Sequence, residues 1–298
     1  MMASAQALSE APSPSITMVR SLPQGVDELS QMGPFDLFTI QMESGSTEAK
    51  VDAMKRLNIV AFAMGKEPVL SNLIPYLQTL SMKQPPPEDE ILLLLARQVQ
   101  GFVPGLLQSP KDVLALVPIL ERLAAVEETV VRDEAVSGMN HICQQFLTAA
   151  PVEPFVSQSL VAMAKRLVGA DWFTAKVSAA GMLPKIFEVT RHAEIPHLYK
   201  ELCMDETPMV RRSASLHLGE LLATLGGSKN EKANELMPVL QQLCKDEQDS
   251  VRMLAVASLS KVGGSYAKSP EWTKEFFLPI VKEGSTDMSW YVVLVFRW

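Results

Sequence analysis

Four apolar or small positions, at offsets 0, 4, 8 and 11, recur along this chain at intervals of 35 to 44 residues. Steps of three and four residues place all four positions on one face of an α-helix. The pattern is clearest in residues 205–222, DETPMVRRSASLHLGELL, where a polar turn precedes the helix. A pattern that returns at this period predicts a stacked helical array. A seventh, partial copy begins at Val292. The six complete copies are Ala49, Ala53, Leu57, Val60; Ile91, Leu95, Val99, Phe102; Val131, Ala135, Met139, Ile142; Ala175, Ala179, Leu183, Ile186; Val210, Ala214, Leu218, Leu221; and Val251, Ala255, Leu259, Val262.

A proline precedes several of these copies at a nearly constant distance. Pro118, Pro238 and Pro279 each lie 13 residues before the first position of a copy, and Pro196 lies 14 residues before it. Inside a helix, proline removes a backbone N–H and clashes with the preceding turn, which bends the helix. The predicted unit is therefore a bent helix, an acidic turn and a straight helix.

Four segments of the chain carry a closer signal than the period alone. They are VEETVVRDEAV (126–136), ADWFTAKVSAAG (170–181), DETPMVRRSAS (205–215) and DEQDSVRMLAVAS (246–258). Paired helices repeated at this interval resemble the HEAT family, and these segments are similar to the third to sixth repeats of the scaffold A subunits of type 2A protein phosphatases. The resemblance is to the N-terminal half of that scaffold. It implies an all-α HEAT-repeat solenoid, an armadillo-like superhelix with about six complete repeats and a truncated seventh.

The two ends of the chain differ from the array between them. Residues 1–33 are rich in Ser, Ala, Pro and Gln without a sustained helical period, so we expect a disordered tail at 1–33 and a HEAT-repeat array at 34–298. The last nine residues, WYVVLVFRW, combine high β-propensity with a single charge. We expect residues 291–298 not to form a stable helix in the isolated chain, and the chain to self-associate through this end.

Charge, apolar run length and cysteine usage limit the partners and the compartment. The net charge of -7 argues against a nucleic-acid partner, because phosphate binding needs clustered positive charge. The longest apolar run, residues 290–296, is far shorter than the ~20 residues of a membrane span, so we expect a soluble protein with no membrane partner. We expect Cys143, Cys203 and Cys244 to be reduced and buried in a cytoplasmic protein, with the nucleus left open as a second location.

Residue patterns typical of catalysis are missing from the sequence. It has no Cys-x-x-Cys pair, no His-Glu-x-x-His, no Gly-x-Gly-x-x-Gly and no phosphate-binding loop. His192 and His197 are five residues apart, a spacing that does not place two ligands on one helical face, and His217 lies between Leu216 and Leu218. We expect no catalytic residue, no cofactor and no metal, and we predict that the chain is not an enzyme.

The turns between the two helices of each repeat are acidic. In a stacked array these turns lie along one edge and form a continuous surface that suits a large partner. The residue after the first position of most copies is basic, and we expect it to pair with the acidic turn of a neighbouring repeat. Leu92 and Val293 interrupt this series. Its members are Lys50, Arg132, Lys176, Arg211 and Arg252.

Trp172 and Trp290 lie in two of the acidic turns. A tryptophan there exposes apolar area unless it packs between repeats or meets a partner, and both interpretations stay open. The resemblance favours the partner, since in phosphatase A subunits this edge of the N-terminal half binds the exchangeable regulatory B subunits. Matched position by position, the resemblance implies partner-binding roles for Glu90, Glu128, Trp172, Phe173, Thr207, Pro208, Arg211, Arg212 and Trp290.

The resemblance also limits the function. The family's scaffold is considerably longer, and its catalytic subunit docks on repeats without a counterpart here, so we expect the catalytic subunit to bind only a full-length form. We predict a non-catalytic scaffold or regulatory subunit of a type 2A serine/threonine phosphatase that binds regulatory B subunits. The alternative is another HEAT or armadillo interaction module, such as a nuclear transport receptor, although the Trp-x-x-x-Asn arrays of the armadillo type are absent.

Overall fold

The computed structural model describes residues 31–148, 152–226, 230–266 and 270–295. Within these ranges the regular structure is entirely helical, which confirms the all-α prediction. The predicted tail at 1–33 lies outside the described residues except for its last three positions.

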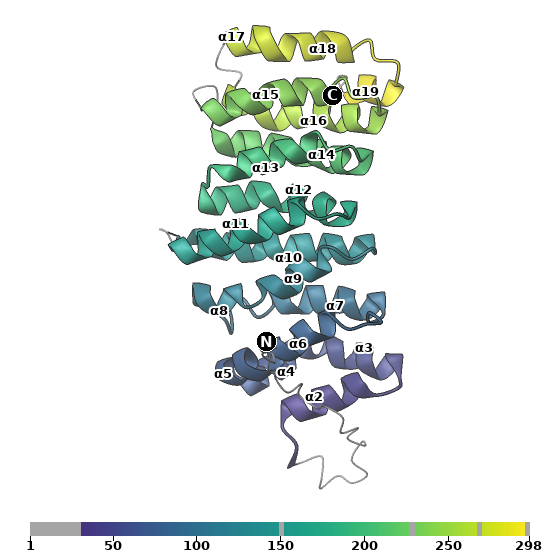
Figure 1. Cartoon of the computed structure of the whole chain (residues 1–298), viewed down its shortest axis with the longest axis vertical. Helices are drawn as coiled ribbons and strands as arrows, with labels where there is room; N and C mark the ends of the chain where they lie inside the picture. Colours follow the sequence, from purple (N-terminus) through teal and green to yellow (C-terminus); the bar gives the residue numbers. More distant parts are fainter. Residues whose placement is uncertain (1–30, 149–151, 227–229, 267–269, 296–298) are drawn as a thin grey trace, which may run out of the picture.

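Seven helix pairs are stacked along the long axis of the described part of the chain (Figure 1). We call these pairs repeats one to seven. The first helix of each repeat is α2 (Pro34–Glu43); α5 (Lys66–Pro68), η1 (Val69–Leu73) and α6 (Ile74–Ser81); α8 (Pro110–Leu114) and α9 (Val117–Leu123); α11 (Pro154–Val168); α13 (Glu194–Cys203); α15 (Glu231–Leu243); and α17 (Pro270–Trp272), η2 (Thr273–Phe277) and α18 (Leu278–Gly284). The second helix is α3 (Thr47–Lys55) and α4 (Leu57–Met64); α7 (Asp89–Gln100); α10 (Thr129–Thr148); α12 (Phe173–Thr190); α14 (Pro208–Leu225); α16 (Asp249–Tyr266); and α19 (Trp290–Val295).

The second helices pack against one another in chain order, from α3 through α7, α10, α12, α14 and α16 to α19. The four-position pattern lies in this layer, and all its positions in the six complete copies are buried except Ala49 and Val60, which are partly exposed. Both exceptions are in repeat one, which has no preceding repeat among the described residues to cover it. Hydrophobic burial between neighbouring repeats therefore stabilises the stack, as the period predicts.

The prolines of the first helices bend the chain in some repeats and not in others. Pro75 and Pro279 are the second residues of the helices that follow the π-helical segments η1 and η2, and Pro118 follows the break between α8 and α9. A residue without a backbone N–H cannot continue the α-helical bonding, so the preceding turn widens or ends. The predicted bend is wrong at Pro196, which lies in the first turn of α13, where the missing N–H costs no hydrogen bond. Helix α15 continues through Pro238.

The C-terminal segment differs from its prediction. Residues 290–295 form helix α19, and Val292 is fully buried in the contact of α19 with α16. The expectation of no stable helix is therefore wrong up to Val295, because the seventh copy of the apolar pattern finds the face of α16 to pack against. Residues 296–298 lie outside the described part. Self-association through this end stays a prediction.

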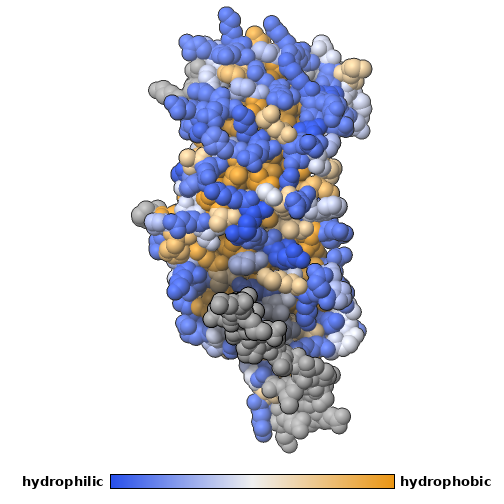
Figure 2. Space-filling view, in the orientation of Figure 1, coloured by the Kyte–Doolittle hydropathy of each residue, from blue (hydrophilic) through white to orange (hydrophobic). Residues whose placement is uncertain are grey.

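The last features of the fold are the burial of the cysteines and the hydropathy of the surface. Cys143 and Cys203 are buried as predicted, and burial raises the pKa of the Cys143 thiol to about 12. Cys244 is only partly buried, which corrects the prediction for that residue. In the described part of the chain no helix is both long and apolar enough to cross a membrane. Figure 2 shows a largely hydrophilic face with hydrophobic side chains visible mainly toward the middle of the stack.

Candidate interaction surface

The turns between the two helices of each repeat lie along one edge of the stack, on the right in Figure 1. We call this surface the turn edge; it comprises residues 44–46, 82–88, 124–128, 169–172, 204–207, 244–248 and 285–289 with the first helical turn that follows each. Among the described residues, fourteen large hydrophobic side chains are exposed, and eight of them lie on the turn edge. Exposed apolar side chains that gather on one edge indicate a surface for a partner. The eight are Met82, Val130, Trp172, Met204, Met209, Met288, Trp290 and Tyr291.

Arg211 shows how consecutive turns are joined along this edge. Its Nε and Nη2 donate to the two carboxylate oxygens of Asp246 at 2.7 and 3.1 Å, and Nη2 also donates to Glu247 at 3.3 Å. Its Nη1 donates to the backbone carbonyls of Asp205 and Glu206 in its own turn, both at 3.0 Å. The side chain is only 13% exposed, and its guanidinium joins repeat five to repeat six. We call such a contact between a basic side chain and the acid of the next turn a rung.

The same arrangement recurs one repeat later. Arg252 donates to both oxygens of Asp287 at 2.8 and 2.9 Å and clamps its own turn through the carbonyls of Asp246 and Glu247. The hydrogen-bonded Arg252 guanidinium lowers the pKa of the Asp287 carboxyl, and the Asp287 carboxylate in turn raises the pKa of Arg252. Bidentate hydrogen bonds between charged groups are stronger than hydrogen bonds between neutral groups.

Two lysines make simpler rungs. Lys176 donates to Asp205 at 2.9 Å, and Lys50 lies 3.9 Å from Glu88. With Arg211 and Arg252, they confirm the prediction that the basic series pairs with the acidic turn of the next repeat. Arg132 is the exception, since its guanidinium bonds only its own turn, through the carbonyls of residues 126 and 127 and the hydroxyl of residue 129.

The rungs are absent between repeats two and three and between repeats three and four. Five residues before the first position of a copy, repeats five to seven carry Asp205, Asp246 and Asp287, whereas repeats three and four carry Val126 and Ala170. On the cationic side, repeat two has Leu92 where repeats one and three to six have Lys or Arg. We call turns 82–88, 124–128 and 169–172 the ladder gap, because at neither of its two junctions does a basic side chain pair with an acid in the turn of the next repeat.

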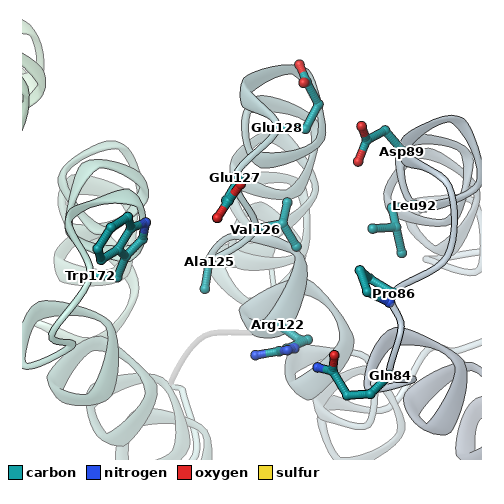
Figure 3. Close-up of a pocket in the computed structure, with 10 residues that line it drawn as sticks. All are labelled: Gln84, Pro86, Asp89, Leu92, Arg122, Ala125, Val126, Glu127, Glu128 and Trp172. Carbon is teal, nitrogen blue, oxygen red and sulfur yellow. The ribbon is translucent and has the colours of Figure 1, made fainter.

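A pocket of about 800 Å³ opens in the ladder gap (Figure 3). Figure 3 shows Trp172 on one side of the third turn and Leu92 and Pro86 on the other, with the carboxyl of Glu127 directed toward the Trp172 side. Arg122 lies at the opposite end of the pocket from Glu128. Leu92 and Val126 occupy the two rung positions between repeats two and three, so the space that long paired side chains fill elsewhere is left open. The lining residues are Gln84, Pro86, Asp89, Leu92, Arg122, Ala125, Val126, Glu127, Glu128 and Trp172.

Comparison with known proteins agrees with the helical-repeat fold. The HEAT repeat family model matches residues 236–265. The protein phosphatase PP2A regulatory A subunit of Saccharomyces cerevisiae is 33% identical over 244 residues, 79% of this chain and 37% of that protein. The protein of the same name from Schizosaccharomyces pombe is 30% identical over 274 residues, 90% of this chain and 44% of that protein. This chain is a HEAT-repeat relative of the PP2A regulatory A subunits.

A human protein of the same kind shows a similar level of identity. The beta isoform of the human serine/threonine-protein phosphatase 2A 65 kDa regulatory A subunit is 36% identical over 204 residues, 67% of this chain and 32% of that protein. The chain thus spans less than half the length of the curated relatives it matches. These names describe regulatory and not catalytic subunits, in agreement with the prediction that the chain is not an enzyme. A designed armadillo repeat protein superposes on 75% of the chain with a TM-score of 0.43 and 14% identity.

The predicted site residues of this A-subunit relative fall into three groups. Glu128 and Trp172 line the pocket, and the Phe173 ring lies 5.7 Å from the Trp172 ring. Glu90 is exposed in the first turn of α7, beside the pocket. The second group, Thr207, Pro208, Arg211 and Arg212, lies at the fifth turn, and Trp290 lies alone at the seventh.

The residues of the second and third groups differ in how far their side chains are exposed to a partner. Pro208 and Arg212 are exposed, and the Thr207 N–H donates to Asp205 at 2.8 Å to shape the turn. Arg211 is instead held inside the molecule by its rung and is only slightly exposed, and a partner-binding role for it stays a prediction. Trp290 is 60% exposed and stacks on Tyr291 with ring centroids 4.0 Å apart.

Sequence reasoning missed several residues of the pocket. Leu92 was expected only to interrupt the basic series, and the structure places it in the pocket wall opposite Trp172. Asp89 and Glu127 are part of the acidic turns, but nothing in their spacing distinguished them from the acids of other turns. Arg122 comes from α9, outside the turns. The usable signal was the missing Asp five residues before the third and fourth copies.

The described residues give little support for a metal-binding or catalytic role. No group of three or more His, Cys, Asp or Glu among them could hold a metal ion. The histidines have ordinary partners: His217 contacts Glu220 at 3.3 Å, His197 contacts Lys232 at 3.1 Å and His192 lies 3.7 Å from Glu194. The hydrogen bond from His217 and the neighbouring Lys261 lower the pKa of Glu220 to about 2.

Proposed function

We propose that this chain is a non-catalytic scaffold that binds regulatory B subunits of a type 2A serine/threonine phosphatase through its turn edge. The observation that carries the proposal is the gathering of exposed apolar side chains on this one edge in a relative of the PP2A regulatory A subunits. Exposed Trp side chains are typical of interface hot spots. Trp172 and Trp290 are the largest of the exposed side chains, so they are the expected anchors.

We further propose that the catalytic subunit docks on parts of the relatives that have no counterpart in this chain. The chain covers 37% of the S. cerevisiae relative and 44% of the S. pombe relative. A stacked array binds different partners at different repeats, because each repeat contacts only its neighbours. The chain should therefore bind a B subunit in the cytoplasm or nucleus without binding the catalytic subunit directly.

The test of B-subunit binding uses purified B subunits and a matched pair of variants. Pro208 and Pro154 both begin a helix and are both exposed, but only Pro208 lies on the turn edge. Titration calorimetry should show that Pro208→Arg weakens binding about tenfold or more, while Pro154→Arg leaves it unchanged. Circular dichroism checks that both variants keep their helices. Equal affinities for both variants and for the unaltered chain would contradict the proposed edge.

The catalytic subunit supplies the second test. Size-exclusion chromatography of the chain with purified catalytic subunit should show two separate peaks, whereas the chain with a B subunit should elute as a complex. Tight direct binding of the catalytic subunit would show that the described repeats already contain its docking surface.

A further inference from the structure

The outer end of repeat one, at the bottom of the stack in Figure 1, is an open apolar groove. It has a volume of about 410 Å³, and its lining includes Leu37 and Phe38 from α2 and Val60 and Ala63 from α4. Val60 is the last position of its copy of the pattern and is partly exposed, whereas the same position is fully buried in the other five copies. The groove is thus a face that interior repeats keep covered, and a helical array needs an end unit that covers it.

We propose that residues 22–31 form a helix that packs into this groove and closes the N-terminal end of the array. The occupant is a segment of the same chain. Residues 22–30 lie outside the described part of the chain, and their sequence, the groove and the point where the chain reaches it support this placement. The expected disordered tail is then confined to residues 1–20.

The chain reaches the groove at its first described residues. Met32 lines the groove and is partly buried, and Gln31 before it is helical. Consecutive Cα atoms are about 3.8 Å apart, so the segment starts next to the groove. A segment on a short tether acts at an effective concentration of about 1 mM, which favours it over a separate partner.

The segment has the pattern of a short amphipathic helix. Ser21 and Gln24 match the Ser-x-x-Gln capping box that marks a helix start. Leu22, Val26 and Leu29 follow at offsets 0, 4 and 7, which places them on one helical face. This face is the one that would enter the groove.

The segment needs the groove in order to be helical. Ten residues are too few for a helix that is stable alone in water, and Gly25 weakens it further. Pro23 is compatible with the helix, because it falls in the first turn, where backbone N–H groups have no partner within the helix. Burial of the apolar face against repeat one therefore supplies the stability that the segment lacks.

The charges of the segment and the groove are complementary. Residues 21–31 contain Asp27 and Glu28 and no basic residue. Arg56 lines the groove and is exposed; its guanidinium donates to an amide oxygen and a backbone carbonyl, and it forms no ion pair with a described residue. An unpaired cation beside the groove favours an acidic segment and helps to fix its register.

Thiol labelling of matched variants of the full chain measures where the helix lies. Leu29→Cys places a thiol on the apolar face, and Gln31→Cys places one on the opposite, exposed face. A maleimide should label Leu29→Cys about tenfold or more slowly, because the groove covers it. The unaltered chain gives the background rate, since Cys143 and Cys203 are buried and burial raises the pKa of Cys244 to about 12. Equal labelling of the two variants would overturn the proposal.

A further substitution tests whether the groove is the covering surface. Ala63 is exposed and lies outside the buried pattern, so Ala63→Arg fills the groove and leaves the core intact. In the Leu29→Cys chain it should raise the labelling rate to that of Gln31→Cys. Ala193→Arg adds the same side chain at an exposed alanine of repeat five and should leave Leu29→Cys protected. Protection that survives Ala63→Arg, in a variant whose circular dichroism is unchanged, would place the helix elsewhere and overturn the proposal.

Protein concentration decides whether the helix comes from the same chain. Protection of Leu29→Cys should be equal at about 1 µM and about 100 µM protein, since a tethered segment does not depend on concentration. Protection only at the higher concentration would mean that a second copy fills the groove, which would also overturn the proposal. These measurements involve no phosphatase subunit, so the proposed function is tested separately.

Discussion

The ladder gap and the turns of repeats five to seven have the same backbone plan and differ in what joins one turn to the next. In repeats five and six an arginine, Arg211 or Arg252, closes its own turn and binds an aspartate in the turn of the next repeat. In the ladder gap Val126 and Ala170 stand in the aspartate position. The buried layer beneath is alike in both regions, so the turn residues alone decide whether the edge is closed or open.

This difference shows how one repeat pattern combines stability with binding. Paired turns use the charges of their rung residues inside the molecule, and Pro208 and Arg212 remain exposed beside a rung. The ladder gap gives up that internal pairing and presents acids, an exposed indole and an open pocket. The following predictions test whether the two regions are as similar in their core, and as different at their edge, as the structure indicates.

The largest effect should be the same in both regions. Leu95 in repeat two and Leu218 in repeat five both lie on the apolar face of the pattern, at offsets 4 and 8, and both are fully buried. Replacing either with Ala should lower the free energy of unfolding by about 2–5 kcal/mol, because it removes buried methylene groups and leaves a cavity. Denaturant titrations of both variants measure this. Costs that differ several-fold would show that the two cores are not equivalent.

The next largest effect, also on the free energy of unfolding, should differ between the two regions. Arg211→Leu removes five hydrogen bonds and leaves Asp246, which is 9% exposed, without its cation. We expect a loss of about 3 kcal/mol in unfolding free energy. Arg132→Leu removes bonds to neutral groups only and should cost about 1–2 kcal/mol. If the same titration gave Arg132→Leu the larger cost, the rungs would not be the stronger joints.

Acid should weaken the paired turns selectively. The pKa of Asp287 is lowered in the folded chain by the Arg252 hydrogen bonds. A carboxyl with a lowered folded pKa contributes its full stability above its ordinary pKa of 3.8, and this is lost as the pH falls through the folded value. Hydrogen exchange, corrected for its intrinsic pH dependence, should therefore increase around residues 285–289 below pH 3.8 before it does around 124–128. Uniform loss of protection would argue against local control by the rungs.

The smallest effect should be a gain in stability. Ala170 occupies the aspartate position opposite Arg132, whose guanidinium is already held by its own turn. Ala170→Asp should complete this rung and raise the unfolding free energy by about 0.5–1 kcal/mol, since a partly exposed ion pair contributes little more. A raised thermal midpoint that disappears in 1 M salt, where the Debye length is about 3 Å, would show that the gain is electrostatic. No change, or a lower midpoint, would show that this junction cannot accept a rung.

Much of the fold could be predicted from periodicity. A helix with apolar residues at offsets 0, 4, 8 and 11 must bury that face, and the face of Val210, Ala214 and Leu218 is fully buried. The ends and bends of the helices were harder to predict, because they depend on local hydrogen bonding that the repeat period does not specify. Pro196 lies in the first turn of its helix and bends nothing, and α19 forms because α16 offers it a surface.

The sequence by itself determined the stack, the series of basic side chains and the edge on which partners are expected. Only the tertiary structure decided which of those charges the molecule uses internally. Arg211 and Arg132 hold the same place in their repeats, but one reaches an aspartate of the next turn and the other has no carboxylate to reach. Such pairing depends on contacts between residues about 35 positions apart, so the pocket beside Trp172 becomes visible only once neighbouring turns are in place.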